Sequence, residues 1–148
     1  EFSRKVQANF ADDETWTVRG VTVPPSTSYS EINLTNVMQG ANVHFVGLAG
    51  KDGRLPGANN MSIGSASLQV NVSPMSNGMR LTLVSAVDDR GREVERTGGG
   101  GGGGKHGFGL KWQPDAKTLD IKLALHKSRF AEYLVRPPTV STNQTPFR

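Results

Sequence analysis

A run of seven consecutive glycines at 98–104 is the feature that most limits how this chain can fold. Glycine has no side chain to bury and loses the most freedom on folding, so the run predicts a loop rather than a strand or helix. A coil of that length spans roughly 15 Å, enough to join neighbouring strands or cross the roughly 10 Å between stacked sheets. The 44 residues after it are too few for a separate domain without metal or disulfides. We therefore expect one domain over 1–148 with a flexible glycine loop at 98–104, and leave open whether the run is natural or engineered.

Short segments with alternating apolar and polar positions recur on both sides of the glycine run. The clearest is 119–125, where Leu119, Ile121, Leu123 and Leu125 are each separated by one residue. A spacing of two is that of a strand with one buried face. The same pattern, less regular, predicts strands at 15–23, 29–37 and 68–72, with 79–87 as the partner strand of the last. A compact apolar run at 42–48, a short aromatic segment at 108–112 and the segment 130–135 predict three more. No segment has helical periodicity, so eight strands are expected.

Turn signals separate these segments and define the expected architecture. Gly20 marks a shift of alternation phase within 15–23, and Asn77-Gly78 predicts a hairpin that joins 68–72 to 79–87. Residues 114–117 predict a further turn. Together the segments indicate an antiparallel β-sandwich, immunoglobulin-like or jelly-roll. Residues 1–14 and 139–148 lack clean alternation and are expected to be extended arms.

The composition excludes several classes of protein. The chain has no cysteine, which rules out disulfides, thiolate zinc sites and a cysteine nucleophile. No apolar stretch is long enough to cross a membrane as a helix. Four glycosylation sequons, more than chance provides, indicate an extracellular or cell-surface protein, and they begin at Asn33, Asn60, Asn71 and Asn143.

The net charge of +4 comes entirely from residues 105–136. Four basic residues of that region, Lys122, His126, Lys127 and Arg129, are the candidates for binding an anionic partner. The alternative is a solvated strand face whose lysines discourage edge-to-edge pairing.

The two tryptophans, Trp16 and Trp112, are the candidates for a sugar-binding platform. Aromatic residues among the basic ones could also stack on nucleic-acid bases. However, alternation turns most of these rings inward, where large aromatic side chains normally pack. Nucleic acid is therefore not an expected partner.

Catalytic patterns are missing from the sequence. The three histidines stand at no metal-ligand spacing, and no Gly-X-Ser-X-Gly elbow is present. The pair Asp88-Asp89 is interpreted as a turn, although a carboxylate pair with Asp120 or Glu132 is an alternative. We expect no enzyme, no metal and no cofactor.

These observations predict a non-enzymatic β-sandwich module for protein–protein binding or self-assembly. A sheet edge can accept an extended strand from another chain, and the arms could supply it. The alternative is a module that binds carbohydrate or another anionic polymer through the basic C-terminal strands.

Overall fold

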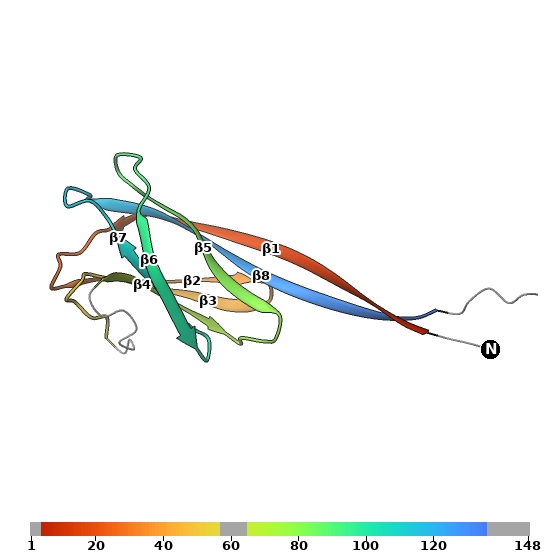
Figure 1. Cartoon of the computed structure of the whole chain (residues 1–148). Coiled ribbons are helices and arrows are strands. Elements are labelled where there is room, and N and C mark those ends of the chain that lie inside the picture. The colour runs from red at the N-terminus through yellow and green to blue at the C-terminus, as the bar shows by residue number, and fades with distance from the viewer. Residues whose placement is uncertain (1–3, 57–64, 136–148) are drawn as a thin grey trace, which may run out of the picture. The chain divides into compact units, whose positions relative to one another are not determined.

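The structure is a computed structural model that describes residues 4–56 and 65–135, with side chains for 13–56 and 65–128. Every regular element in the described residues is a β-strand (Figure 1). The strands are β1 (Arg4–Thr22), β2 (Tyr29–Met38), β3 (Ala41–Ala49), β4 (Ala66–Ser73), β5 (Met79–Asp88), β6 (Glu95–Gly102), β7 (Lys105–Lys111) and β8 (Thr118–Val135).

The strands form two antiparallel sheets. One has three strands in the order β1-β8-β5, and the other has five in the order β2-β3-β4-β7-β6. The chain changes sheet between β1 and β2, between β4 and β5, between β5 and β6, and between β7 and β8. The predicted all-β sandwich is confirmed.

The chain divides into two compact units. The larger comprises Asp13–Lys127, and the smaller contains the first part of β1 and the last part of β8. Residues 4–14, predicted to belong to an extended arm, are thus part of strand β1. The second predicted arm, 139–148, lies outside the described residues.

The core of the larger unit lies between the two sheets. Phe45 and Leu68 contribute from the five-stranded sheet, and Ile121 and Leu123 from the three-stranded sheet, all with no measurable exposure. The alternation at 119–125 therefore points into the core, as the sequence predicted. Burying each such side chain stabilises the fold by about 1.5–3 kcal/mol.

The glycine run differs most from the prediction. Only Gly103 and Gly104 form the expected loop, whereas Gly98–Gly102 belong to β6 and pair with β7. Both turn residues have positive φ, 62° and 84°, which a two-residue hairpin of this kind requires. The prediction of a loop over 98–104 was wrong for its first five residues. These glycines pair with β7 through backbone hydrogen bonds, which need no side chain on β6.

The eight strands are therefore not the eight that were predicted. The segment 95–102 was missed, and the segments 119–125 and 130–135 are parts of one strand, β8. The predicted hairpin at Asn77-Gly78 was also wrong, because β4 pairs with β3 and β7 while β5 pairs with β8. The turn there connects the two sheets instead.

The predicted irregularity at Gly20 is confirmed. Its φ is 68°, and its N–H donates to the Asp120 carboxylate at 2.9 Å. Val18 and Val21 on either side are both buried, which a regular alternation would not allow.

Candidate binding sites

The outer edge of β6 is an exposed backbone edge with almost no side chains. β6 ends the five-stranded sheet, and each of its residues is exposed. Its one register irregularity lies between Arg96 and Gly98, before the glycine segment Gly98–Gly102 begins. The peptide groups of this segment that do not face β7 are thus open to an approaching chain.

Two cavities lie between this glycine segment and the facing strand β5. The larger, about 410 Å³, is lined by the glycines with Met75, Leu81, His106 and Phe108. The smaller, about 210 Å³, is lined by Leu81, Leu83, Phe108 and the start of β6. Because glycine fills no space, the rings of β7 beneath it are only half-buried.

The two rings below the glycines are stacked on each other. His106 and Phe108 have centroids 6.4 Å apart and planes 11° from parallel. Burial lowers the pKa of His106, although the Gly104 carbonyl, 3.1 Å from Nδ1, acts in the opposite direction. The imidazole is therefore uncharged at neutral pH, and the floor of the larger cavity carries no charge.

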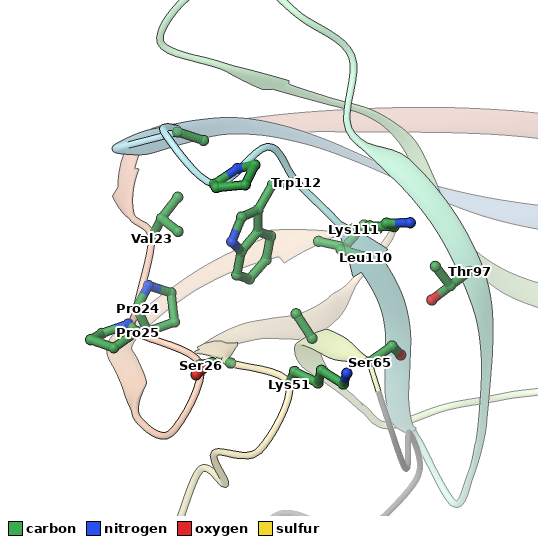
Figure 2. Close-up of a pocket in the computed structure, with 14 residues that line it drawn as sticks. Val23, Pro24, Pro25, Ser26, Lys51, Ser65, Thr97, Leu110, Lys111 and Trp112 are labelled. Atoms are coloured by element: carbon green, nitrogen blue, oxygen red, sulfur yellow. The ribbon is translucent and has the colours of Figure 1, made fainter.

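A larger pocket, about 720 Å³, is built around Trp112 just after β7. Figure 2 shows its indole in the middle of the lining, with Val23 and Pro24 on one side and Leu110 on the other. The ionisable residues that line this pocket are Lys51 and Lys111. The volume is within the range of pockets for small ligands.

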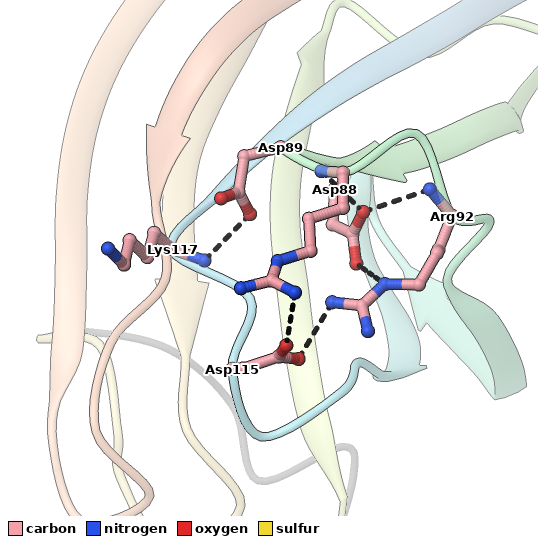
Figure 3. Close-up of polar contacts among 6 residues, drawn as sticks. Asp88, Asp89, Arg92, Asp115 and Lys117 are labelled. Atoms are coloured by element: carbon pink, nitrogen blue, oxygen red, sulfur yellow. Dashed lines mark hydrogen bonds and ion pairs between the residues drawn. The ribbon is translucent and has the colours of Figure 1, made fainter.

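A cluster of charged residues holds the β7–β8 turn, which lines this pocket through Pro114 and Ala116 (Figure 3). Asp88, whose side chain is 1% exposed, accepts hydrogen bonds from the N–H groups of Arg90 and Arg92 at 2.9 Å. The Arg92 guanidinium contacts Asp88 at 2.8 Å and Asp115 at 2.7 Å. Asp89 accepts a bond from the Lys117 N–H at 2.9 Å. We call Asp88, Asp89, Arg92 and Asp115 the carboxylate clasp.

The clasp holds its carboxylates in the ionised form. Burial of Asp88 acts to raise its pKa, but the hydrogen bonds from Arg92 and Arg90 outweigh it, and the pKa lies below 3.8. The Arg92 side chain lowers the pKa of Asp115, and the Lys117 N–H lowers that of Asp89. The Asp88-Asp89 pair thus forms a turn, as interpreted from the sequence, and its closest partners are donors rather than other carboxylates.

The basic residues predicted on the C-terminal strands are not gathered into one group. Because residues of a strand alternate between its two faces, Lys122 and His126 lie on one face of β8 and Lys127 lies on the opposite face. The Nδ1 of His126 lies 2.8 Å from the Asp13 carboxylate, so this nitrogen already contacts an acidic group. Arg129 belongs to β8, and its side chain lies outside the described ones.

The two tryptophans have different environments. Trp16 packs on the core with its ring edge-on to Phe45, at a centroid distance of 6.4 Å and an angle of 80°. Trp112 also packs against the core but lines the pocket. Among the predicted binding residues whose side chains are described, Trp112 lines this pocket.

Sequence reasoning missed Lys51 and Lys111 as partners of Trp112. Lys111 is its chain neighbour, but Lys51 follows β3 and reaches the pocket through the fold. No signal in the sequence joins residues so far apart. Among the described residues, no cluster of three or more His, Cys, Asp or Glu could hold a metal ion.

Comparison with known proteins gave no match to a protein-family model, a curated protein or a solved structure. In the part of the chain that the structure describes, there is no helix that could span a membrane.

Proposed function

We propose that this protein is a non-enzymatic β-sandwich module that self-associates by adding a strand to the outer edge of β6. The observation that carries this proposal is the glycine segment Gly98–Gly102, an exposed edge strand free of side chains. An incoming strand binds such an edge through main-chain hydrogen bonds.

The glycine segment lacks the features that normally keep a sheet edge from pairing. Natural edges are guarded by lysine, proline, a bulge or very short length. Here β6 is eight residues long, and its bulge and its two charged residues precede the glycines. The second edge of the same sheet, β2, has a bulge between Glu31 and Leu34 and a full set of side chains.

The cavities beside β6 supply specificity. In a strand added to β6, every second side chain would point to the face of the sheet that covers the core. The larger cavity, which Gly99–Gly104 line together with Phe108 and Leu81, lies beside these positions. A strand with apolar residues at alternate positions would fill these cavities, and specificity in strand addition arises from such pockets.

The occupant that we propose is the strand pair in the smaller unit of a second copy. Its parts of β1 and β8, 4–12 and 128–135, are close in length to the eight residues of β6. An isolated two-stranded ribbon is marginally stable in water and gains from pairing with a third strand. One chain thus carries both the open edge and a strand pair that can extend it.

The test compares two lysine variants by light scattering after size exclusion, over roughly a hundredfold range of concentration. Gly102→Lys places a charge on the proposed edge, at a position where an added Cβ meets nothing within 4 Å. Asn36→Lys places the same charge on the exposed β2 edge and serves as the control. A third sample lacks residues 1–12, which removes the β1 half of the proposed donor pair and leaves 128–135 without its partner strand.

The unaltered chain and Asn36→Lys should form the same discrete multimer, and its apparent Kd should rise at least tenfold in Gly102→Lys. The shortened chain should remain monomeric. A monomer at every concentration of the unaltered chain contradicts self-association. Equal weakening by both lysines would place the contact elsewhere than β6.

We also propose that the protein acts outside the cell or at its surface. The excess of sequons supports this, and the two in the described residues begin at Asn33, which is exposed, and Asn71, which is half-buried. Expression in a glycosylating host should add one or more glycans, detected as a mass shift that a glycosidase removes. A secreted product without any glycan would remove this support.

A further inference from the structure

The pocket around Trp112 does not include the glycine segment Gly98–Gly102 that carries the proposed self-association, and it offers a second kind of contact. Its lining comes from the β1–β2 connection, the residues after β3, the start of β4, β6, β7 and the β7–β8 turn. A pocket of 720 Å³ can enclose a ligand of the size of one or two sugar rings.

One side of the pocket is apolar and suited to the flat face of a ring. The Trp112 indole is flanked by Pro24, Pro25 and Leu110 (Figure 2). The C–H face of a pyranose packs against such a surface through dispersion and the removal of apolar area from water. An indole provides the largest contact area for this purpose and loses little rotamer freedom.

The polar part of the lining is cationic and hydroxylic. Lys51 and Lys111 are exposed, and neither makes an ion pair with a described residue. Three hydroxyls, from Ser26, Ser65 and Thr97, also belong to the lining, and none of the described lining residues is acidic. Hydroxyls donate and accept, as sugar hydroxyls do, while two ammonium groups select for an anion.

The pocket is held in shape before any ligand arrives. An added Cβ on Gly50 would lie 2.1 Å from the Pro25 carbonyl oxygen, so these two segments are in close contact. The Gly50 N–H donates to the Ser28 carbonyl at 2.8 Å, and the Val23 N–H to the Lys117 carbonyl at 3.0 Å. A preformed site loses less free energy to ordering on binding.

We infer that this pocket binds an acidic saccharide unit, a pyranose that bears a carboxylate or sulfate. Trp112 stacks on the ring, the hydroxyls of the lining meet the hydroxyls of the sugar, and Lys51 and Lys111 neutralise the anion. This site differs from the basic C-terminal strands that the sequence predicted for an anionic polymer, because it combines the charge with an aromatic platform.

The test is a titration followed by the indole N–H signals in nuclear magnetic resonance spectra. The probes are trigalacturonic acid, its fully methyl-esterified and therefore neutral form, a heparin-derived tetrasaccharide, and inorganic sulfate. Trp16, edge-on to Phe45 in the core, provides an internal control signal. The variants are Lys51→Gln with Lys111→Gln, Trp112→Leu, and Lys122→Gln with Lys127→Gln as the matched double control.

At least one acidic oligosaccharide should shift the Trp112 signal and leave that of Trp16 in place. The pocket double variant should weaken binding about tenfold, consistent with two partly exposed charge contacts. The control on β8 should change affinity less than twofold. In Trp112→Leu, which has no indole in the pocket, the backbone N–H signals of Lys51 and Lys111 serve as the reporter. They should no longer shift with the acidic probes, while the Trp16 signal shows that the fold persists.

Three results would overturn the inference. The first is equal binding of the neutral ester, and the second is binding of inorganic sulfate as tight as that of either oligosaccharide. The third is no shift with either acidic probe up to about 10 mM, which limits the Kd to weaker values than that. Because monomeric and associated protein both carry the pocket, these outcomes are independent of whether the chain self-associates.

Discussion

Gly102 and Gly104 stand two residues apart in the same run but are subject to opposite constraints. At Gly102 an added Cβ meets nothing within 4 Å, whereas at Gly104 it lies 2.3 Å from the Val72 carbonyl oxygen with φ at +84°. We predict that Gly102→Ala raises the free energy of unfolding by about 0.5 kcal/mol, because the unfolded chain loses freedom. Gly104→Ala should lower it by about 1–3 kcal/mol.

Urea denaturation of the two alanine variants measures both changes. If β6 is formed as described, the two have opposite signs. Changes that are equal, or both near zero, would show that residues 98–104 form one uniform coil, as the sequence alone predicted.

β6 was not predicted because glycine has no side chain. Strand prediction relies on side chains that alternate between a buried and an exposed face, and Gly98–Gly102 have no side chains to alternate. The strand exists because β7 presents a backbone edge whose own residues, such as Leu110, are fixed by the core. The cause of the strand therefore lies in β7, and the glycine sequence alone does not indicate it.

Two connecting elements, the β5–β6 loop and the β7–β8 turn, are joined by the carboxylate clasp. The pKa values of Asp88, Asp89 and Asp115 are lowered in the folded protein, so folding favours their ionised forms. This contribution is complete above the ordinary aspartate pKa and is lost as the pH falls through the lower folded values. We therefore predict decreasing stability as the pH falls below about 4.

Asp88→Asn tests this prediction, because the amide loses the charge-assisted bonds to Arg92. The melting temperature of Asp88→Asn should be several degrees lower at pH 7 and should approach that of the unaltered chain in acid. Asp52→Asn, at an exposed carboxylate, should follow the unaltered chain throughout. Parallel melting curves for Asp88→Asn and the unaltered chain at every pH would contradict the role of the clasp.

The elements whose alternation is undisturbed were predicted best. Leu119, Ile121 and Leu123 predicted the core-facing part of β8. However, 119–125 and 130–135 were predicted as two strands, because the continuity of β8 between them depends on pairing rather than on alternation. In β2, Asn33 takes a φ of 54° at a bulge, and Leu34 is 45% exposed as a result. A bulge of this kind, unlike the one at Gly20, has no glycine to mark it.

The candidate pocket was predictable only in part. Trp112 was identified because large aromatic rings are few in this chain, but Lys51 and its hydroxyl neighbours enter from connections far apart in the sequence. Their meeting is a property of the topology, which strand patterns alone do not determine.

Self-association through strand addition should cover one edge of one sheet. In β6 the amides that do not face β7 should exchange rapidly in the monomer and become protected when a second copy adds a strand. The opposite edge, β2, should be unaffected.

The most direct test is hydrogen exchange measured by mass spectrometry at two protein concentrations roughly a hundredfold apart. The peptide containing Gly98–Gly102 should exchange at least tenfold more slowly at the higher concentration, and that containing Tyr29–Met38 should not change. Gly102→Lys should abolish the difference. Exchange in β6 that is the same at both concentrations, or protection gained only in β2, would contradict self-association through the glycine edge.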